Sequence, residues 1–379
     1  MKVLFLTPWY PDEKVKNHGV FVREQANAIA SRHEVVVISA KIDYENFGLS
    51  SHTLTKSEFG NLKEYHLVIK RSLPFYNQLN YFLICRRISV EVAKSLNPDV
   101  IHGNIGYPGA FWSWLVSRKI HKPFVITEHT FIYNNFRSFF HKTLTLLALV
   151  RAATVIAVSK KSAEEIGKHS RAKVTVIPNI VDASRFSIHP YQPGAVNIGF
   201  AGGLSSPNHV KGLDVLLRVM SKIKTNFVLH IAGDGPLREE YQSVANQLGV
   251  LEKCKFYGFV NYNEMPAFME RLHFFVNASR FESFGIAIIE AMSSGLPVIC
   301  FDNGGPGDFV NDTNGILVEN QNEEKLREAI ERMMLTYPAF KREKIRESVL
   351  LKFSKDKFVN SIESVYSSAV GQYLIKQLP

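Results

Sequence analysis

Both halves of this 379-residue chain open with the same succession of an apolar run, a glycine-containing turn and an amphipathic stretch. The first half shows it over residues 2–31, around Gly19, and the second over 197–223, around Gly202 and Gly203. A buried strand that leads through a glycine turn into a helix is the unit of doubly wound parallel sheets. The pattern predicts an α/β chain with two Rossmann-like domains in tandem and βαβ connections throughout.

The domain boundary is expected at residues 182–194, where Pro190, Pro193 and Gly194 interrupt a polar stretch without periodicity. We therefore expect a first domain over 1–185 and a second over 190–354. From Asn314 and Gly315 onward the pattern is helical almost to the end, and it carries an apolar stripe from Phe353 to Tyr366.

The composition is that of a globular chain that lies in a reducing compartment. Apolar residues make up 46% of it, and only three cysteines are present, too few for a disulfide framework. No stretch reaches the roughly 18 uninterrupted apolar residues that a membrane-spanning helix needs. These features predict a cytoplasmic protein.

The net charge of +10 is unevenly distributed. Residues 1–190 contain 25 Lys and Arg against 14 Asp and Glu, whereas residues 191–379 contain 20 against 21. A basic half is typical of proteins that bind nucleic acid, an anionic membrane surface or an acidic substrate. No nucleic-acid-binding module and no basic-aromatic stripe is recognisable, so we do not expect nucleic acid as a partner.

The segment 279–290 carries the strongest indication of chemistry. Glu282 follows an apolar strand and directly precedes a predicted helix over 284–294, with Ser283 as its N-cap. Free backbone N–H groups of Phe284, Gly285 and Ile286 would there form an anion site. Glu290, on the same helix, would point back toward that site. Two carboxylates beside an anion suit a nucleoside diphosphate sugar, whose hydroxyls would donate to them; a helix cap and a surface glutamate explain the pattern equally well.

A second candidate phosphate site lies at residues 200–217. Gly202 and Gly203 follow a strand, and Lys211 precedes a helix, where its ammonium group can reach a diphosphate. Such turns also serve merely to reverse the chain. In the first half, His129 follows an apolar strand, at the edge where doubly wound sheets bind ligands, although a structural role is the commoner one.

Several chemistries are disfavoured because their motifs are missing. The sequence has no G-x-x-x-x-G-K-[ST] loop, no Gly-x-Ser-x-Gly elbow and no clustered His/Cys metal site. It also lacks Asp-x-Asp. We therefore expect no metal and no cofactor besides the nucleotide-sugar substrate.

Taken together, the motifs resemble those of the retaining glycosyltransferases of family 4 (glycosyl transferases group 1), over essentially the whole chain. The matching elements occur in the family's order: Gly19, "PDVIH" at 98–102, "TEH" ending at His129, "IPNIVD" at 177–182, "VKGLDVLL" at 210–217, "GDGP" at 233–236, "SRFESFG" at 279–285, Glu290, "GLPVI" at 295–299 and "NGILV" at 314–318. The resemblance implies the GT-B fold, in which two Rossmann-like parallel-sheet domains face each other across a cleft. It also implies that a C-terminal helix at about 355–379 packs back on the first domain.

The resemblance implies roles for individual residues. Lys211 would neutralise the leaving diphosphate, Glu282 would bind hydroxyls of the donor sugar, and Glu290 would bind ribose. His129 would contact the donor sugar. Gly19 would allow the backbone to approach the diphosphate, and Val260 would contact the base through its backbone.

One departure from the family pattern affects the expected phosphate site. Gly203 stands where the family usually has an arginine on the diphosphate. His209, Arg238 or Arg280 could replace that cation, and the sequence does not choose among them.

The resulting hypothesis is a metal-independent, retaining transfer of a sugar from a UDP- or GDP-sugar to an acceptor hydroxyl, in polysaccharide biosynthesis. The basic first half favours an anionic acceptor, most simply a lipid-linked saccharide at the inner face of the membrane. Apolar, cationic segments at 81–94 and 136–151 are compatible with peripheral membrane contact or with ordinary core helices. The alternatives are a nucleotide-sugar epimerase or phosphorylase on the same plan and a non-catalytic protein that binds anionic surfaces.

Overall fold

The computed structural model describes residues 1–12, 18–49, 51–73, 76–132, 136, 138–205 and 209–375, and the chain forms two compact units. The first unit contains residues 1–180 and 355–379, and the second contains 181–354. Residues 181–185, which we expected in the first domain, fall in the second unit. The Arg346 guanidinium holds them there, because it donates to the carbonyls of Ala183 at 2.8 Å and Phe186 at 2.6 Å.

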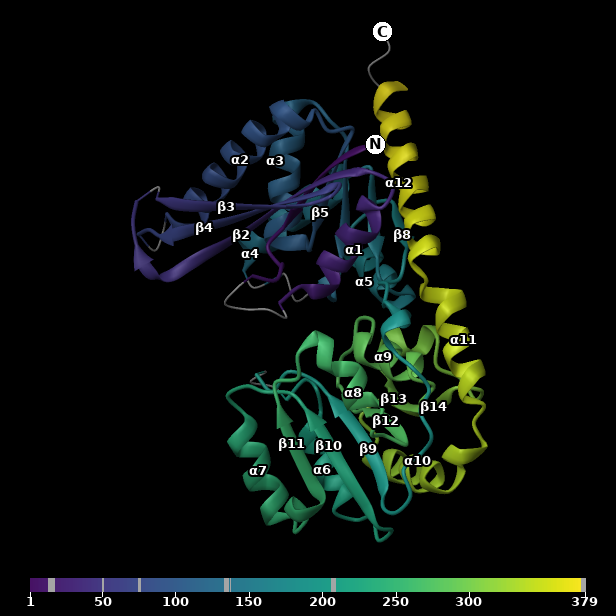
Figure 1. The fold of residues 1–379 in the computed structure, drawn as a ribbon. Helices are drawn as coiled ribbons and strands as arrows, with labels where there is room; N and C mark the ends of the chain where they lie inside the picture. The colour runs from purple at the N-terminus through teal and green to yellow at the C-terminus, as the bar shows by residue number, and fades with distance from the viewer. Residues whose placement is uncertain are drawn as a thin grey trace. The chain divides into compact units, whose positions relative to one another are not determined.

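The first unit is built on an eight-stranded sheet in the order β3-β4-β2-β1-β5-β6-β7-β8 (Figure 1). Its strands are β1 (Lys2–Thr7), β2 (Glu34–Phe47), β3 (His52–Phe59), β4 (Leu62–Arg71), β5 (Val100–Asn104), β6 (Phe124–Glu128), β7 (Thr154–Ala157) and β8 (Val174–Val176). All neighbours are parallel except β3 and β4, which form an antiparallel hairpin directly after β2. The expectation of βαβ connections throughout was therefore wrong here. The sequence gives little sign of β3, because its side chains are polar and largely exposed.

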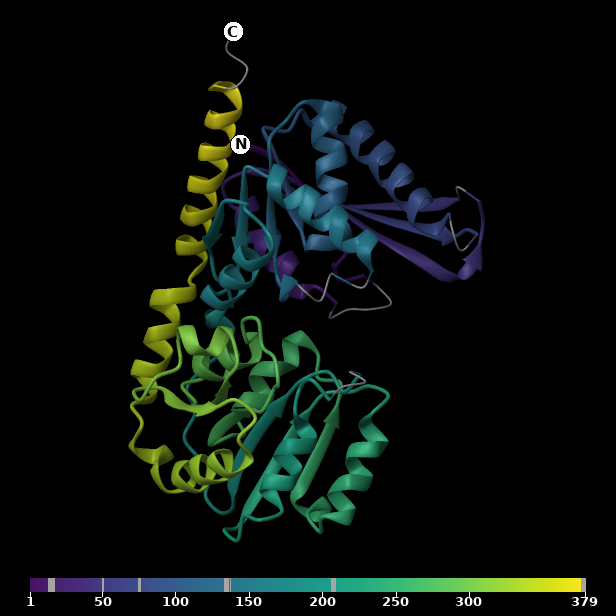
Figure 2. The same ribbon diagram turned by 180° about the vertical axis from the view of Figure 1, so that it is seen from behind.

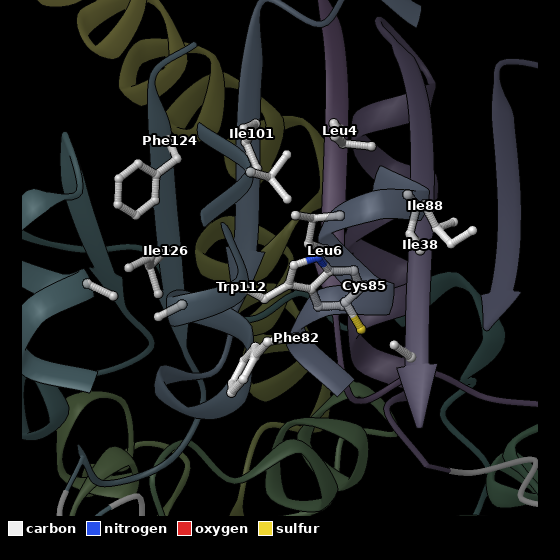
Figure 3. Close-up of a cluster of buried hydrophobic side chains, with 14 of the residues drawn as sticks. Leu4, Leu6, Ile38, Phe82, Cys85, Ile88, Ile101, Trp112, Phe124 and Ile126 are labelled. Atoms are coloured by element: carbon white, nitrogen blue, oxygen red, sulfur yellow. The ribbon is translucent and has the colours of Figure 1, made fainter. Parts of the chain in front are cut away.

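Alternation along the strands determines which helices cover each face of this sheet. On one face of the sheet, Leu4 and Leu6 of β1 pack against α2 (Asn77–Leu96), α3 (Phe111–Ile120) and α4 (Phe139–Arg151). Figure 3 shows Phe82, Cys85 and Trp112 of these helices in the same cluster. The intervening side chains of β1 face α1 (Val20–Ala30) and α12 (Lys355–Ile375). α5 (Lys160–His169) packs on the first of these faces, and Figure 2 gives the opposite view of the ribbon.

The C-terminal helix α12 belongs to the first unit although the whole second unit separates them in sequence. Its Tyr366 is fully buried, and the Tyr366 hydroxyl lies 2.6 Å from Nδ1 of His102 on β5. Nε2 of His102 in turn lies 2.7 Å from the Thr127 hydroxyl on β6. At the other end of the helix, Arg32 pairs with Asp356 at 3.0 Å. From Phe358 to Tyr366 the apolar stripe of the sequence thus covers the α1 side of the first sheet, whereas Phe353 packs in the second unit.

The second unit contains a six-stranded, all-parallel sheet in the order β11-β10-β9-β12-β13-β14. Its strands are β9 (Val196–Ala201), β10 (Phe227–Ala232), β11 (Cys254–Gly258), β12 (Phe274–Asn277), β13 (Val298–Asp302) and β14 (Gly315–Glu319). Its α-helices are α6 (Leu213–Met220), α7 (Arg238–Gln247), α8 (Met265–Met269), α9 (Ile286–Ser293), α10 (Glu323–Thr336) and α11 (Arg342–Phe353). We expected a helical pattern directly after Gly315, but residues 315–319 add β14 at the edge of the sheet.

The strand order reverses direction beside the first strand of each sheet. In the first unit β1 lies between β2 and β5, and in the second β9 lies between β10 and β12 (Figure 1). Ligands of open α/β sheets bind at such points, outside the carboxyl ends of the strands. The loops after β9 and β12 carry Lys211 and Glu282, so the topology brings these two residues together. None of the helices within the described residues is both long and apolar enough to span a membrane.

Candidate active site

A close backbone contact positions Lys211. Gly212 adopts φ +71° as the residue before α6, and a Cβ at this position would overlap the carbonyl oxygen of Ala278, just after β12. Nearby, the N–H of Arg280 donates to the carbonyl of Val210 at 2.7 Å. The loop before α6 is therefore fastened to the loop after β12. The Lys211 side chain also lies along Gly202, where a Cβ would come within 3.1 Å of its Cγ.

Lys211 and Glu282 form an ion pair, with Nζ 2.9 Å from Oε2. The Lys211 side chain is 35% exposed and that of Glu282 only 12%. The Ser279 hydroxyl donates to the same carboxylate oxygen at 3.4 Å, and the Glu282 carbonyl accepts from the N–H of Gly305 at 2.8 Å. A partly exposed pair of this kind contributes little to stability. The ion pair instead holds a cation and a carboxylate side by side, so that the cation could bind a phosphate and the carboxylate could accept a hydrogen bond from a sugar hydroxyl.

The start of α9 differs from the sequence-based expectation in one respect. Gly285, in the left-handed conformation at φ +102°, precedes the helix, and no side chain caps it, so Ser283 is not the N-cap. The first helical acceptor is the Gly285 carbonyl, which receives the N–H of Ile288 at 3.0 Å. By helix geometry the N–H groups of Gly285, Ile286 and Ala287 have no acceptor within α9. Phe284 is buried beside Phe353, so the phenyl ring anchors this turn in the core.

Glu290 is buried on α9, with only 7% of the residue exposed. Its carboxylate makes no hydrogen bond or ion pair with any residue in the described part of the chain. Burial raises the pKa of Glu290 from 4.5 to about 7, and the positive charge of Arg185 opposes this rise. A buried carboxylate without a partner is costly, and ligand hydroxyls would satisfy it.

The raised pKa predicts how Glu290 affects stability in the absence of nucleotide. Between pH 4.5 and 7 the folded chain keeps a proton on Glu290 that the unfolded chain has lost, so the free energy of unfolding falls as pH rises. Glu290→Gln should therefore stabilise the second unit at pH 8 by up to about 3 kcal/mol and have little effect at pH 5. Denaturant unfolding of both proteins at the two pH values measures this. An equal effect at both would contradict the raised pKa.

Arg280, His209 and Arg238, which could replace the family arginine, differ in the hydrogen bonds and ion pairs that they already make. The Arg280 guanidinium binds both carboxylate oxygens of Asp214, at 2.9 and 2.7 Å, and the carbonyl of His209. The His209 ring is 2.9 Å from the Tyr241 hydroxyl and 3.6 Å from Glu240. Arg238 makes a looser ion pair with Asp234, at 3.6 Å, and its side chain is 36% exposed. Arg238 is thus the least engaged of the three.

Gly203 and Val260 lie in loops at the same edge of this sheet. Among the described residues a Cβ at Gly203 would meet only Ser205 Oγ, at 3.7 Å, so these residues leave room for a side chain there. Val260 is half-buried and follows Gly258, whose carbonyl accepts from the N–H of Gly233 at 2.8 Å. This bond joins the loop after β11 to the "GDGP" turn after β10.

His129 and Gly19 lie in the first unit, close to one another. His129 is buried at the end of β6, with Nε2 2.9 Å from Asn104 Oδ1, and burial lowers its pKa to about 3. Its imidazole is therefore neutral near pH 7. The ring lies 4.8 Å from that of Phe21, in the first turn of α1, and Gly19 precedes this helix with φ +75°. A Cβ at Gly19 would come within 2.5 Å of the Trp9 carbonyl carbon, so this turn requires glycine.

The structure also reveals polar groups to which the sequence analysis gave no role. Glu128 is fully buried beside His129 and accepts from the N–H groups of Gly106 at 2.6 Å and Thr130 at 2.9 Å. Its position before the histidine in "TEH" was the available signal. Arg185, close to Glu290, had no signal, because it lies in a short 3-10 turn without periodicity. No three His, Cys, Asp or Glu side chains of the described ranges gather as a metal site would require.

Comparison with known proteins decides the family. The model for glycosyl transferases group 1 matches residues 204–349, and the model for glycosyltransferase family 4 matches residues 18–185. The chain is a family 4 glycosyltransferase. Lys211, Glu282 and Glu290 lie within the first match, and Gly19 and His129 lie within the second. The α/β architecture with two Rossmann-like parallel-sheet units is that of the GT-B fold, as we expected.

Relatives of this family 4 glycosyltransferase extend over most of its length. It is 28% identical to an uncharacterized glycosyltransferase of Methanocaldococcus jannaschii, over 83% of this chain and 89% of the relative. It is 26% identical to the Campylobacter jejuni N-acetylgalactosamine-N,N'-diacetylbacillosaminyl-diphospho-undecaprenol 4-alpha-N-acetylgalactosaminyltransferase, over 79% and 81%. Among solved structures, Anabaena HepE in complex with UDP and glucose superimposes with a TM-score of 0.75 at 20% identity, covering 97% of this chain and 100% of HepE.

Proposed function

We propose that this glycosyltransferase transfers a sugar, with retention and without a metal ion, from a nucleoside diphosphate donor to a saccharide acceptor. The observation that carries the proposal is the group formed by the Lys211–Glu282 ion pair, the first turn of α9 and the unpartnered carboxylate of Glu290. A donor has one group for each: a diphosphate for the cation and the amides, and sugar and ribose hydroxyls for the carboxylates. HepE, which has the same fold, is known in complex with UDP and glucose.

Each residue would act by binding and positioning in this proposal. Lys211 would bind the diphosphate and stabilise the charge that develops on it as the sugar leaves. Glu282 would accept from donor-sugar hydroxyls and Glu290 from ribose hydroxyls, which fixes the donor on the second unit. His129, neutral at pH 7, would contact the sugar as a hydrogen-bonding group. Gly19 would let the backbone approach the diphosphate, and the Val260 backbone would contact the base.

A thermal-shift screen with UDP, GDP and their sugars tests the proposal. A donor at 100 times its dissociation constant should stabilise the chain by about 2.7 kcal/mol. The absence of a shift with every nucleoside diphosphate would reject the site. Product formation from donor and acceptor together, but not from donor alone, would distinguish the transferase from an epimerase.

The open space at Gly203 allows a gain-of-function test of the diphosphate site. Gly203→Arg adds a cation where the family usually has one, and a charge-assisted hydrogen bond to phosphate should lower the Kd for UDP or GDP about tenfold. Gly203→Met is the control for side-chain size. Calorimetric titration measures both variants; unchanged affinity in Gly203→Arg would contradict the placement of the diphosphate beside this loop.

We further propose that the acceptor is lipid-linked and that the first unit binds the inner face of a membrane. The Campylobacter relative carries diphospho-undecaprenol in its name. Gln78 of α2 and His141 of α4 lie 2.8 Å apart, and both helices carry exposed apolar and cationic side chains. We propose that these form one surface, the α2–α4 surface, with residues Leu79, Leu83, Phe139, Phe140, Arg87 and Lys142. Apolar side chains among cations are typical of interfacial binding to anionic lipid.

If the α2–α4 surface binds membranes, the protein should sediment with vesicles that contain anionic lipid at low salt. The bound fraction should fall as the salt concentration rises. Phe139→Glu, at a side chain that is 86% exposed, should reduce binding at least tenfold, because it replaces an inserted ring by a repelled charge. The matched control is Leu335→Glu on α10 of the second unit, at 82% exposure. Equal effects of both substitutions, or no binding at low salt, would contradict the proposed surface.

A further inference from the structure

Arg185 is fixed by contacts that leave one of its nitrogens without a partner. Its guanidinium carbon lies 3.3 Å from the centre of the Tyr262 ring, and Nη2 donates to the Tyr262 carbonyl. A guanidinium stacked on a ring and bonded through one terminal nitrogen has a single orientation. The other terminal nitrogen, Nη1, is buried and has no hydrogen-bond partner among the residues that the structure describes.

Glu290 lacks a hydrogen-bond donor, just as Nη1 of Arg185 lacks an acceptor. No described residue pairs with its buried carboxylate, and Arg185 is the charged group that lowers its pKa against the effect of burial. The two groups are thus near enough to interact electrostatically, yet they form no ion pair. The Arg346 guanidinium donates to the carbonyl of Ala183, two residues before Arg185, and to that of Ser293 on α9, so the turn of Arg185 is fastened to the helix of Glu290. A buried donor and a buried acceptor without partners among the described residues thus lie on neighbouring segments of the second unit.

A hydroxyl group could serve both residues at once, because it can accept one hydrogen bond and donate another. Two hydrogen bonds of ordinary length through a single oxygen span roughly 5 to 6 Å, more than an ion pair does. We propose that a ribose hydroxyl of the nucleotide bridges Arg185 and Glu290, accepting from Nη1 and donating to the carboxylate. Arg185 is then a donor-binding residue, and Tyr262 positions it. This inference rests on the proposed function of the second unit.

The bridge would join the part of the nucleotide site that binds the base to the part that binds the ribose. Tyr262 begins the short turn that follows Val260, the expected contact of the base. Arg185 therefore links the loop after β11 to the carboxylate on α9. Ribose recognition and base recognition would depend on the same guanidinium.

The test removes a ribose hydroxyl and replaces Arg185, separately and together, and measures the affinity for the nucleotide in each case. The Kd values of UDP, 2′-deoxy-UDP and 3′-deoxy-UDP are measured by calorimetry for the wild-type chain and Arg185→Met, with the corresponding GDP series in parallel. For the wild type, loss of the bridging hydroxyl should weaken binding about tenfold or more, because it leaves both protein groups unpaired. In Arg185→Met the same deletion should cost less than about threefold. Arg332→Met, at an exposed arginine on α10, is the control and should keep the wild-type penalty.

The outcomes separate this inference from the function on which it rests. Binding of neither UDP nor GDP by the wild type would reject the proposed donor, and the bridge with it. Wild-type binding with the same deoxy penalty in Arg185→Met would reject the bridge alone. A structural role of Arg185 would weaken all three nucleotides by the same factor, which also overturns the inference. Thermal midpoints of the variants show whether each remains folded.

Discussion

Lys211→Ala should lower kcat/KM tenfold to roughly a hundredfold. The substitution removes a charge-assisted hydrogen bond to the leaving diphosphate, worth about 1.5 to 3 kcal/mol. The ion pair with Glu282 at 2.9 Å holds the ammonium group in place before the donor binds, so little reorganisation is needed. The affinity of Lys211→Ala for UDP or GDP should also fall, whereas its affinity for the nucleoside without phosphates should equal that of the wild type.

The controls for this prediction use neighbouring residues. Lys222→Ala, at an exposed lysine just after α6, should leave kcat/KM unchanged. Glu282→Ala should weaken binding of the nucleotide sugar more than that of the nucleoside diphosphate, because Glu282 is expected to bind the sugar directly and the diphosphate only through its hold on Lys211. Full activity of Lys211→Ala, or an equal loss of diphosphate and nucleoside binding, would contradict the assignment.

Gly212→Ala should destabilise the second unit by roughly 3 kcal/mol or more. A residue with a side chain is strained at φ +71°, and its Cβ would overlap the carbonyl oxygen of Ala278, which belongs to backbone and cannot rotate away. The same displacement would move Lys211 away from Glu282. Denaturant unfolding measures the first effect, and the affinity for UDP or GDP measures the second.

Gly249 offers a matched control, because it has the same φ of +71° but no atom of the residues that the structure describes within 4 Å of the position of a Cβ. Gly249→Ala should cost only about 1 kcal/mol, the price of the backbone conformation alone. The difference between the two variants isolates the close approach of the loops after β9 and β12. Equal losses of stability in the two variants would show that the close approach of these loops does not affect the free energy of unfolding.

The sequence predicted the fold of the second unit better than that of the first. Strands such as β9, β10 and β13 are short apolar runs bounded by glycine or proline, and their pattern is unmistakable. The hairpin of β3 and β4 was missed because β3 is polar and largely exposed, and because the buried residues of β4 alternate with partly exposed ones and include Glu64, so neither strand is a continuous apolar run. Gly285, rather than Ser283, precedes α9, because the turn needs a positive φ that only glycine adopts at low cost.

The sequence predicted candidate site residues but not the contacts that they make. Lys211, Glu282 and Glu290 were singled out from turn chemistry and from a family resemblance, and the strand order explains why the first two meet. Nothing in the sequence indicated that Asp214 would engage Arg280 or that Tyr262 would hold Arg185. Each of these pairs joins segments more than 60 residues apart in the chain, and local patterns carry no information about such contacts.

The sequence by itself determined the two-sheet architecture, the family and the loops from which the candidate site is built, because these follow from apolar periodicity, glycine positions and motif order. The tertiary structure alone decided which polar groups are satisfied. It pairs Arg280 with Asp214 and buries Tyr366 of α12 against His102. Among the residues that it describes, it leaves Glu290 and one nitrogen of Arg185 without partners. The physical reason is that burial and hydrogen bonding depend on which distant segments meet in space.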